Sequence, residues 1–160
     1  MMRWIANLII KRAMRTPYGQ GHLYHEDGSL YMSRWILFET RFLSARVHHI
    51  ATADYDRHLH DHPWNFWSIV LRGGYIERRP VDIDPCFSRF SGTTSQERCS
   101  VTERRAGSIA RRYATDRHSV DLVAKDTWTL FIYGRKRQWW GFYTPAGKVY
   151  FADYSVLAKQ

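Results

Sequence analysis

The sequence predicts an all-β domain with one helix at its N-terminus, and three observations support this. Aromatic residues make up 16% of the 160 residues, and aromatic side chains favour strands. After the first 16 residues, short apolar runs are separated by Gly, Pro, Asn or Asp about every eight to twelve residues, as in sandwiches and barrels. The length suits one domain, residues 1–160, and we see no repeat or linker within it.

Residues 1–16 are predicted to form a helix that packs on the domain. Four side chains recur at intervals of three and four and would share one stripe: Ile5, Leu8, Ile9 and Arg12. The basic residues follow the apolar stretch, whereas a secretory signal begins with its charge. A membrane-surface anchor is the alternative interpretation. Because no stretch approaches the ~20 apolar residues of a membrane span, we expect a cytoplasmic protein that does not bind membranes.

Residues 22–153 are predicted to form a barrel of about ten strands. The first hairpin covers 22–33 and turns at Asp27-Gly28, a common two-residue turn. Residues 41–50 alternate, with Phe42, Ser44, Arg46 and His48 on one face and Leu43, Ala45, Val47 and His49 on the other. The remaining strands are expected at 35–38, 65–71, 75–79, 99–103, 108–113, 118–123, 127–133, 139–143 and 149–152.

One long loop, residues 81–96, is predicted from its content of Asp, Pro, Ser, Gly and Thr. Cys86 and Cys99 form no CxxC motif and no framework of pairs. Two free thiols in a cytosolic protein are therefore expected.

A group of histidines carries the strongest chemical signal. His58, His60 and His62 lie within five residues, and residues two apart on a strand point to the same face. His60 and His62 could therefore bind one metal ion, for which imidazole is a common ligand. A third ligand must come from elsewhere, and His118 is the only histidine C-terminal to the group. The alternative is a surface cluster or a set of buried, hydrogen-bonded imidazoles.

Two stretches resemble the conserved motifs of the cupin superfamily. The first cupin motif runs Gly, five residues, His-x-His, three or four residues, Glu, six residues, Gly. Here His60-x-His62 is followed by four residues, Trp67, six residues and Gly74. The second runs Gly, five residues, Pro-x-Gly, two residues, His, three residues, Asn. Here the sequence has Gly107, Tyr113-x-Thr115, His118 and Leu122 at these positions.

The resemblance implies a cupin-type β-barrel, a double-stranded β-helix or jelly roll, with His60, His62 and His118 as metal ligands. The leading Gly position holds Asp54 and the Glu position holds Trp67, so the usual carboxylate is missing. This pattern resembles the three-His thiol dioxygenases. It also resembles small bacterial and phage cupins with His-Asp-His-Pro-Trp followed by Gly-Gly-Tyr-x-Glu. The implied ion is divalent, with Fe(II) favoured over Zn, Mn or Ni.

Three further side chains are candidates for a catalytic role. Glu77 is placed to supply a fourth ligand or an acid/base group, and the alternative is a carboxylate paired with arginine. Tyr113 and Tyr133 could line the site, where a phenol donates a proton or orients a substrate. Trp67 is predicted to fill the space of the missing glutamate. The aromatic residues around the motif are predicted to be barrel core: Trp64, Phe66, Trp67 and Tyr75.

The chain carries a formal net charge of +9. This charge favours an anionic partner, although a solvated basic surface explains it equally. A run of cations beside two indoles resembles a site for single-stranded nucleic acid: Arg135, Lys136, Arg137, Trp139 and Trp140. We favour the alternative, in which the indoles pack inward or rim the cavity.

The favoured function is a metal-dependent enzyme with Fe(II) and O₂ chemistry of the dioxygenase type on a small anionic molecule. The alternatives are a metal-dependent isomerase or lyase, and a non-catalytic cupin that binds a small ligand, a nucleotide or nucleic acid. The sequence leaves the oligomeric state open, a homodimer included.

Overall fold

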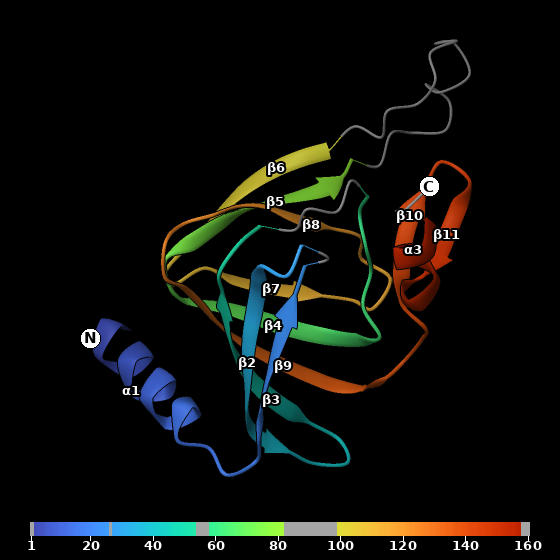
Figure 1. The fold of residues 1–160 in the computed structure, drawn as a ribbon. Coiled ribbons are helices and arrows are strands. Elements are labelled where there is room, and N and C mark those ends of the chain that lie inside the picture. Colours follow the sequence, from blue (N-terminus) through green and yellow to red (C-terminus); the bar gives the residue numbers. More distant parts are fainter. Residues whose placement is uncertain (1, 26, 54–57, 82–98, 158–160) are drawn as a thin grey trace.

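The computed structural model describes residues 2–25, 27–53, 58–81 and 99–157. Strands dominate these ranges, and one helix precedes them, so the predicted all-β fold with an N-terminal helix is confirmed (Figure 1). The described elements are α1 Met2–Met14, β1 Gln20–Tyr24, β2 Leu30–Glu39, β3 Ser44–Ile50, β4 Trp64–Arg72, β5 Gly74–Pro80, β6 Cys99–Arg105, β7 Ile109–Arg112, β8 Ser119–Val123, β9 Thr127–Lys136, β10 Gly141–Thr144, β11 Gly147–Tyr150 and α3 Phe151–Leu157.

Two antiparallel sheets form the barrel. The larger has the strand order β1-β2-β3-β9-β4-β7 and the smaller the order β6-β5-β8. Because neighbours in space are often distant in sequence, as with β3, β9 and β4, the sheets follow the jelly-roll pattern rather than a simple meander. The turn from β4 to β5 needs glycine at Gly73, whose φ is +69°.

The larger sheet has an outer face that α1 covers and an inner face that looks into the barrel. On the outer side Ile10 and Ala13 of α1 pack against three buried side chains of the sheet: Trp35, Val47 and Trp128. On the inner side Val70 contacts residues of the smaller sheet, Tyr75 and Val120. The alternation of side chains along each strand therefore decides which residues reach the interior.

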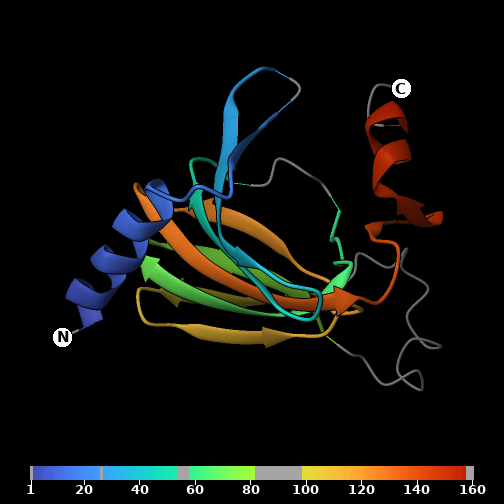
Figure 2. The ribbon, with the colours of Figure 1, turned by 90° about the horizontal axis from the view of Figure 1, so that it is seen from below.

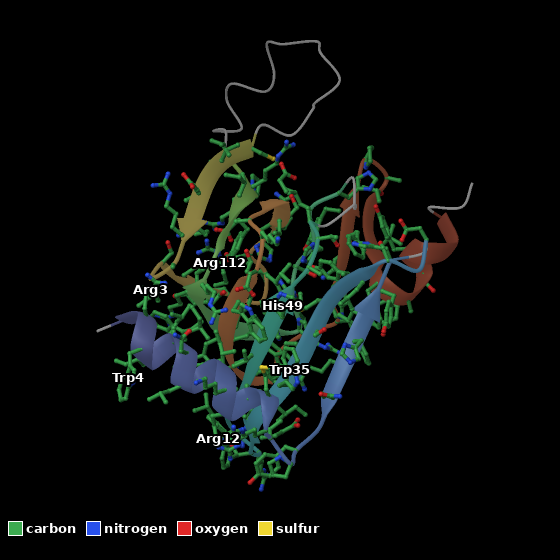
Figure 3. The ribbon with its side chains drawn as sticks, turned by 60° about the vertical axis from the view of Figure 1, so that its left-hand side comes forward. Arg3, Trp4, Arg12, Trp35, His49 and Arg112 are labelled. Atoms are coloured by element: carbon green, nitrogen blue, oxygen red, sulfur yellow. The ribbon has the colours of Figure 1, made fainter. Side chains whose placement is uncertain are left out.

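Helix α1 forms as predicted, but it buries a different stripe. Ile5 and Leu8 are exposed, while Ala6, Ile10 and Ala13 are buried and Ile9 is partly buried. The small side chain of Ala13 lets the helix approach Trp35 and Trp128 of the sheet closely, which a larger side chain would prevent. Trp4 points away from the sheet in Figure 3.

The C-terminal segment differs from the prediction of a strand at 149–152. Strand β11 ends at Tyr150, and helix α3 begins at Phe151. Phe151 stacks on Trp140 and Tyr154 stacks on Phe142, and this spacing of three residues suits a helix. Helices α1 and α3 lie at opposite ends of the barrel (Figure 2).

Most of the predicted loop at 81–96, with Cys86, lies outside the described residues, as does Asp54. Cys99 is the first residue of β6. Among the described residues, no helix is both long and apolar enough to span a bilayer.

Candidate metal centre

The backbone brings His60 and His118 together, although they are far apart in sequence. They form an isolated antiparallel bridge in which each N–H donates to the carbonyl of the other at 2.9 Å. His60 also bridges Phe142 of β10. The N–H of His62 donates to the carbonyl of Ala114 at 3.1 Å. These bonds hold the His-x-His segment against the chain that leads into β8.

The structure therefore places the three predicted ligands in one group, which we call the histidine cluster: His60, His62 and His118. One ring nitrogen of each lies within 4.8 Å of the others. The Nε2 atoms of His62 and His118 are 2.7 Å apart. Two nitrogens bound to one ion at right angles, each at ~2.1 Å, lie about 3 Å apart. The separation of the His62 and His118 nitrogens is thus close to that of two ligands of one ion, and His60 lies within 4.8 Å of both.

Glu77 lies behind the cluster and fixes the proton on His118. The Nδ1 of His118 donates to Glu77 Oε1 at 3.0 Å, because the carboxylate can only accept. The other ring nitrogen of His118, Nε2, faces His62. A carboxylate that accepts from the second ring nitrogen is a common partner of a metal-binding histidine. Glu77 occupies the side of the ring opposite that nitrogen, so its position suits orientation of a ligand rather than direct ligation.

Two arginines complete what we call the Glu77 cluster: Glu77, Arg104, Arg112 and His118. Arg112 of β7 donates to both oxygens of Glu77, at 3.1 and 2.6 Å. Arg104 of β6 donates to Oε2 at 2.8 Å. Burial alone would raise the pKa of Glu77, but the hydrogen bonds from His118 and Arg112 lower it well below its ordinary value. Arg112, labelled in Figure 3, thereby ties the larger sheet to the smaller one.

Asp61, between the two neighbouring histidines, holds their loop in place. Its side chain is fully buried and accepts from the backbone N–H of Gly141, the hydroxyl of Tyr143 and the ammonium of Lys148. Burial and then Asp61 raise the pKa of Tyr143 to about 12, so the phenol stays a donor. Because Asp61 points away from the cluster, His60 and His62 point into it.

Of the two neighbours Phe66 and Trp67, it is Phe66 that faces the histidines. The Phe66 ring lies 4.7 Å from that of His62. Trp67 is 46% exposed on the outer face, where Arg111 lies over its ring. The prediction that Trp67 fills the position of the missing glutamate is therefore wrong. The motif allows three or four residues before that position, and a shift of one residue on a strand changes the face.

The two candidate tyrosines lie in different environments. Tyr133 is buried on the inner face, where its ring contacts Trp64 at 4.5 Å. Tyr113 is 52% exposed and contacts Arg111. Tyr133 therefore lies in the barrel near the cluster, whereas Tyr113 lies at the surface.

The basic run near the C-terminus is divided between surface and interior. Trp139 is exposed, with the ammonium of Lys136 3.0 Å from its ring centre, so of the two predicted placements of the indoles, packed inward or at the rim of a cavity, the first does not hold for this residue. Trp140 packs as predicted, and its ring lies 6.1 Å from that of His60. An open pocket of about 410 Å³ is lined by Trp139 and Tyr150.

The donor set of the histidine cluster fits a divalent transition metal. Burial, followed by the neighbouring His118 and His60, lowers the pKa of His62 well below its ordinary value. Its ring is therefore neutral, which is the form that binds metal. Three imidazole nitrogens suit Zn, Fe, Cu or Ni better than Mg or Ca.

Sequence reasoning missed Arg112 and the role of Asp61; it predicted Phe66 as barrel core, which is confirmed, but not its contact with His62. Arg112 was one arginine among many, and only the pairing of β7 with β4 brings it beside Glu77. For Asp61 a signal was present, since a charged residue between two inward-facing histidines must either reach solvent or find buried partners.

No family model matches the sequence, and no curated protein matches it. Among solved structures, a cupin 2 conserved barrel domain protein from Rhodopseudomonas palustris superposes with a TM-score of 0.55 at 13% identity, over 89% of this chain and 84% of that one. Fe(II)-HppE with the alternative substrate (S)-1-HPP superposes with a TM-score of 0.50 at 16% identity. That match covers 76% of this chain, which spans only 58% of the HppE chain. The chain therefore has the cupin-type β-barrel fold that its two motifs predicted.

Proposed function

We propose that the protein is a metal-dependent enzyme that binds Fe(II) through His60, His62 and His118 and carries out oxygenase chemistry on a small anionic molecule. The observation that carries the proposal is the convergence of three imidazole nitrogens within 4.8 Å of one another, with the carboxylate of Glu77 on the Nδ1 side of the His118 ring. The Fe(II) form of HppE, which shares the fold, supports the choice of iron. The net charge of +9 supports an anionic substrate.

The residues around the cluster have separate tasks in this proposal. Glu77 is a positioning residue that keeps the lone pair of His118 Nε2 directed at the ion. Phe66 and Phe131, whose rings lie 4.5 Å apart, exclude water from one side of the cluster. The hydroxyl of Tyr133 supplies a polar group on the same inner face. When bound, divalent iron with open coordination positions supplies the activation of dioxygen.

Metal analysis tests the binding step. Protein purified without chelator is expected to contain one equivalent of divalent metal, and a variant with alanine at all three histidines is expected to contain none. His58→Ala is the matched control, because His58 contacts Tyr154 rather than the cluster. Circular dichroism shows whether each variant folds. One equivalent of metal in the folded triple variant contradicts the proposal.

Oxygen consumption tests the reaction class. An Fe(II)-loaded sample is expected to take up oxygen with a small carboxylate or phosphonate substrate, and chelator should abolish this uptake. Turnover without oxygen would instead indicate a metal-dependent isomerase or lyase. A protein that binds its ligand but converts none would indicate a non-catalytic cupin.

Nucleic-acid binding is the second candidate, and exposed Trp139 with its neighbouring cations favours it. Single strands that stack on this indole should bind with an affinity that falls as salt rises. Submicromolar binding at physiological salt that is lost in Trp139→Ala, and is insensitive to chelator, would support this candidate over the enzyme.

A further inference from the structure

The inner face of the larger sheet carries a second group of polar side chains, beyond the histidine cluster. Arg34 of β2 pairs with His48 of β3, and Arg46 lies two residues earlier on β3. Residues opposite one another in an antiparallel pair point to the same face. Arg46 lies opposite Phe131 of β9, whose ring is in the interior with Phe66. We call this group the cationic wall: Arg34, Arg46 and His48.

The cationic wall lacks the partners that such groups normally have. The Nε of Arg46 and the Nε2 of His48 are buried and form no hydrogen bond with the residues that the structure describes. Among those residues, no carboxylate forms an ion pair with Arg34 or Arg46. The contact of Arg46 is instead with an aromatic ring, 5.0 Å from the ring centre of Tyr133.

Such an arrangement is costly in the absence of a ligand. Burial lowers the pKa of Arg34, and neighbouring Arg46 lowers it further. A buried donor without an acceptor costs about 1–3 kcal/mol, and a charged one costs more. Buried polar groups are otherwise almost always paired, so the exceptions concentrate at functional sites.

The ring of Phe131 contacts both the cationic wall and the histidine cluster. The ring of His48 stacks on Phe131 at 5.2 Å, and the ring of His62 lies 6.2 Å from the same phenylalanine. A molecule of a few bonds' length could therefore contact both groups.

We propose that Arg34, Arg46 and His48 bind the anionic group, carboxylate or phosphoryl, of the small molecule on which the histidine cluster acts. Two guanidinium groups offer forked donors that match either anion, and the imidazole adds a third polar contact. The role of the bound anion as part of a substrate rests on the proposed function, whereas the anion site itself does not.

The test uses metal-free protein with chelator present, so that no anion can bind through a metal. Inorganic phosphate and acetate are the two probes, titrated separately at constant ionic strength. Binding is measured by calorimetry and by the NMR signals of the arginine Nε–H groups in the wild-type protein. Arg34→Gln/Arg46→Gln is the test variant, and Arg111→Gln, on the exposed outer face, is the control.

At least one probe is expected to bind the wild type, shift the Arg46 signal and lose affinity about tenfold or more in the double variant but not in Arg111→Gln. Phosphate binding assigns a phosphoryl group, and acetate binding alone assigns a carboxylate. Absence of binding, or an equal loss in Arg111→Gln, overturns the proposal. If the double variant does not fold, the Arg46 signal of the wild type decides.

The outcome is independent of the proposed function. Anion binding without any metal affinity removes the enzyme proposal and leaves the anion site. Metal binding at the three histidines without anion binding removes the anion site and leaves the enzyme proposal.

Discussion

Two groups of charged side chains face the same barrel interior, and they differ in how they are compensated. In the Glu77 cluster one buried carboxylate accepts from two arginines and one histidine. In the cationic wall two arginines face a neutral histidine and aromatic rings, and no carboxylate of the described residues forms an ion pair with them. Glu77 and Arg112 are buried, and the three side chains of the wall are half-buried, so a charge without a counter-charge costs free energy in both places.

This difference indicates that the Glu77 cluster stabilises the fold, whereas the cationic wall is suited to bind a ligand. A compensated cluster holds its geometry without help, and Glu77 uses this rigidity to orient His118. The cationic wall, which has no such counter-charge, reaches its lowest free energy only when an anion is bound. Loss of charge should therefore destabilise the protein in the first group and stabilise it in the second.

Glu77→Gln tests the compensated side and should have the largest effect. The nearly isosteric amide leaves Arg112 buried with no counter-charge, so we expect the free energy of unfolding to fall by about 3–5 kcal/mol. Urea denaturation followed by circular dichroism measures this. Glu103→Gln is the control, because it removes a carboxylate whose ion pair with Arg105 is exposed. A loss below about 1 kcal/mol would mean that the cluster does not stabilise the fold.

The pH dependence of stability tests the cationic wall. Burial, followed by Arg34 and Arg46, lowers the pKa of His48 to about 3 from an ordinary 6.5. The unfolded chain therefore binds the proton first as pH falls, so this part of the stability is present above pH ~6.5 and is lost toward pH ~3. His48→Gln, which cannot titrate, should remove up to about 2 kcal/mol of the loss between pH 7 and pH 5. Equal slopes in the two proteins would show that His48 is not held neutral.

Arg46→Met tests directly whether the loss of a charge from the cationic wall raises the free energy of unfolding. Removal of the half-buried charge of Arg46, whose buried Nε has no hydrogen-bond partner among the described residues, should raise the free energy of unfolding by about 1 kcal/mol in ligand-free protein when an apolar side chain of similar length replaces it. Arg112→Met is the matched variant on the compensated side, and it should lower the same quantity. Destabilisation in both variants would show that Arg46 has a structural partner and would remove the contrast.

The sequence allowed the histidine cluster to be predicted better than its surroundings. The two-residue spacing placed His60 and His62 on one face, and the second motif identified His118. The inner position of Arg46 and His48 could not be predicted in the same way. The alternation of residues 41–50 separates them correctly from Val47 and His49, but both faces mix polar and apolar residues. Only the packing of α1 against Val47 decides which face is inside.

Two predictions of which side chain faces the interior were wrong for the same reason: the one for helix α1 and the one for the Glu position of the motif. On α1 the large apolar residues suggested the buried face, while close packing against Trp35 favoured the alanines. At the Glu position of the motif one residue of uncertainty separated Phe66 from Trp67. In both cases a pattern of residue types fixes the period but leaves the phase to tertiary contacts.

Trp67→Glu should have the smallest effect, because it adds a carboxylate on the outer face, away from both charged groups. Trp67 is paired with Ile132, whereas its neighbour Phe66 is paired with Tyr133 on the inner side. We expect the visible spectrum of the cobalt-substituted protein to be unchanged in Trp67→Glu and changed in Phe66→Glu, where a carboxylate would lie beside His62. Stability should change by less than about 0.5 kcal/mol in Trp67→Glu, as for an exposed substitution. A changed spectrum in Trp67→Glu would place that side chain inside the barrel. It would also reverse the inner and outer faces of β4, and with them the assignment of Phe131, Arg46 and His48 to the interior, because these strands share one register.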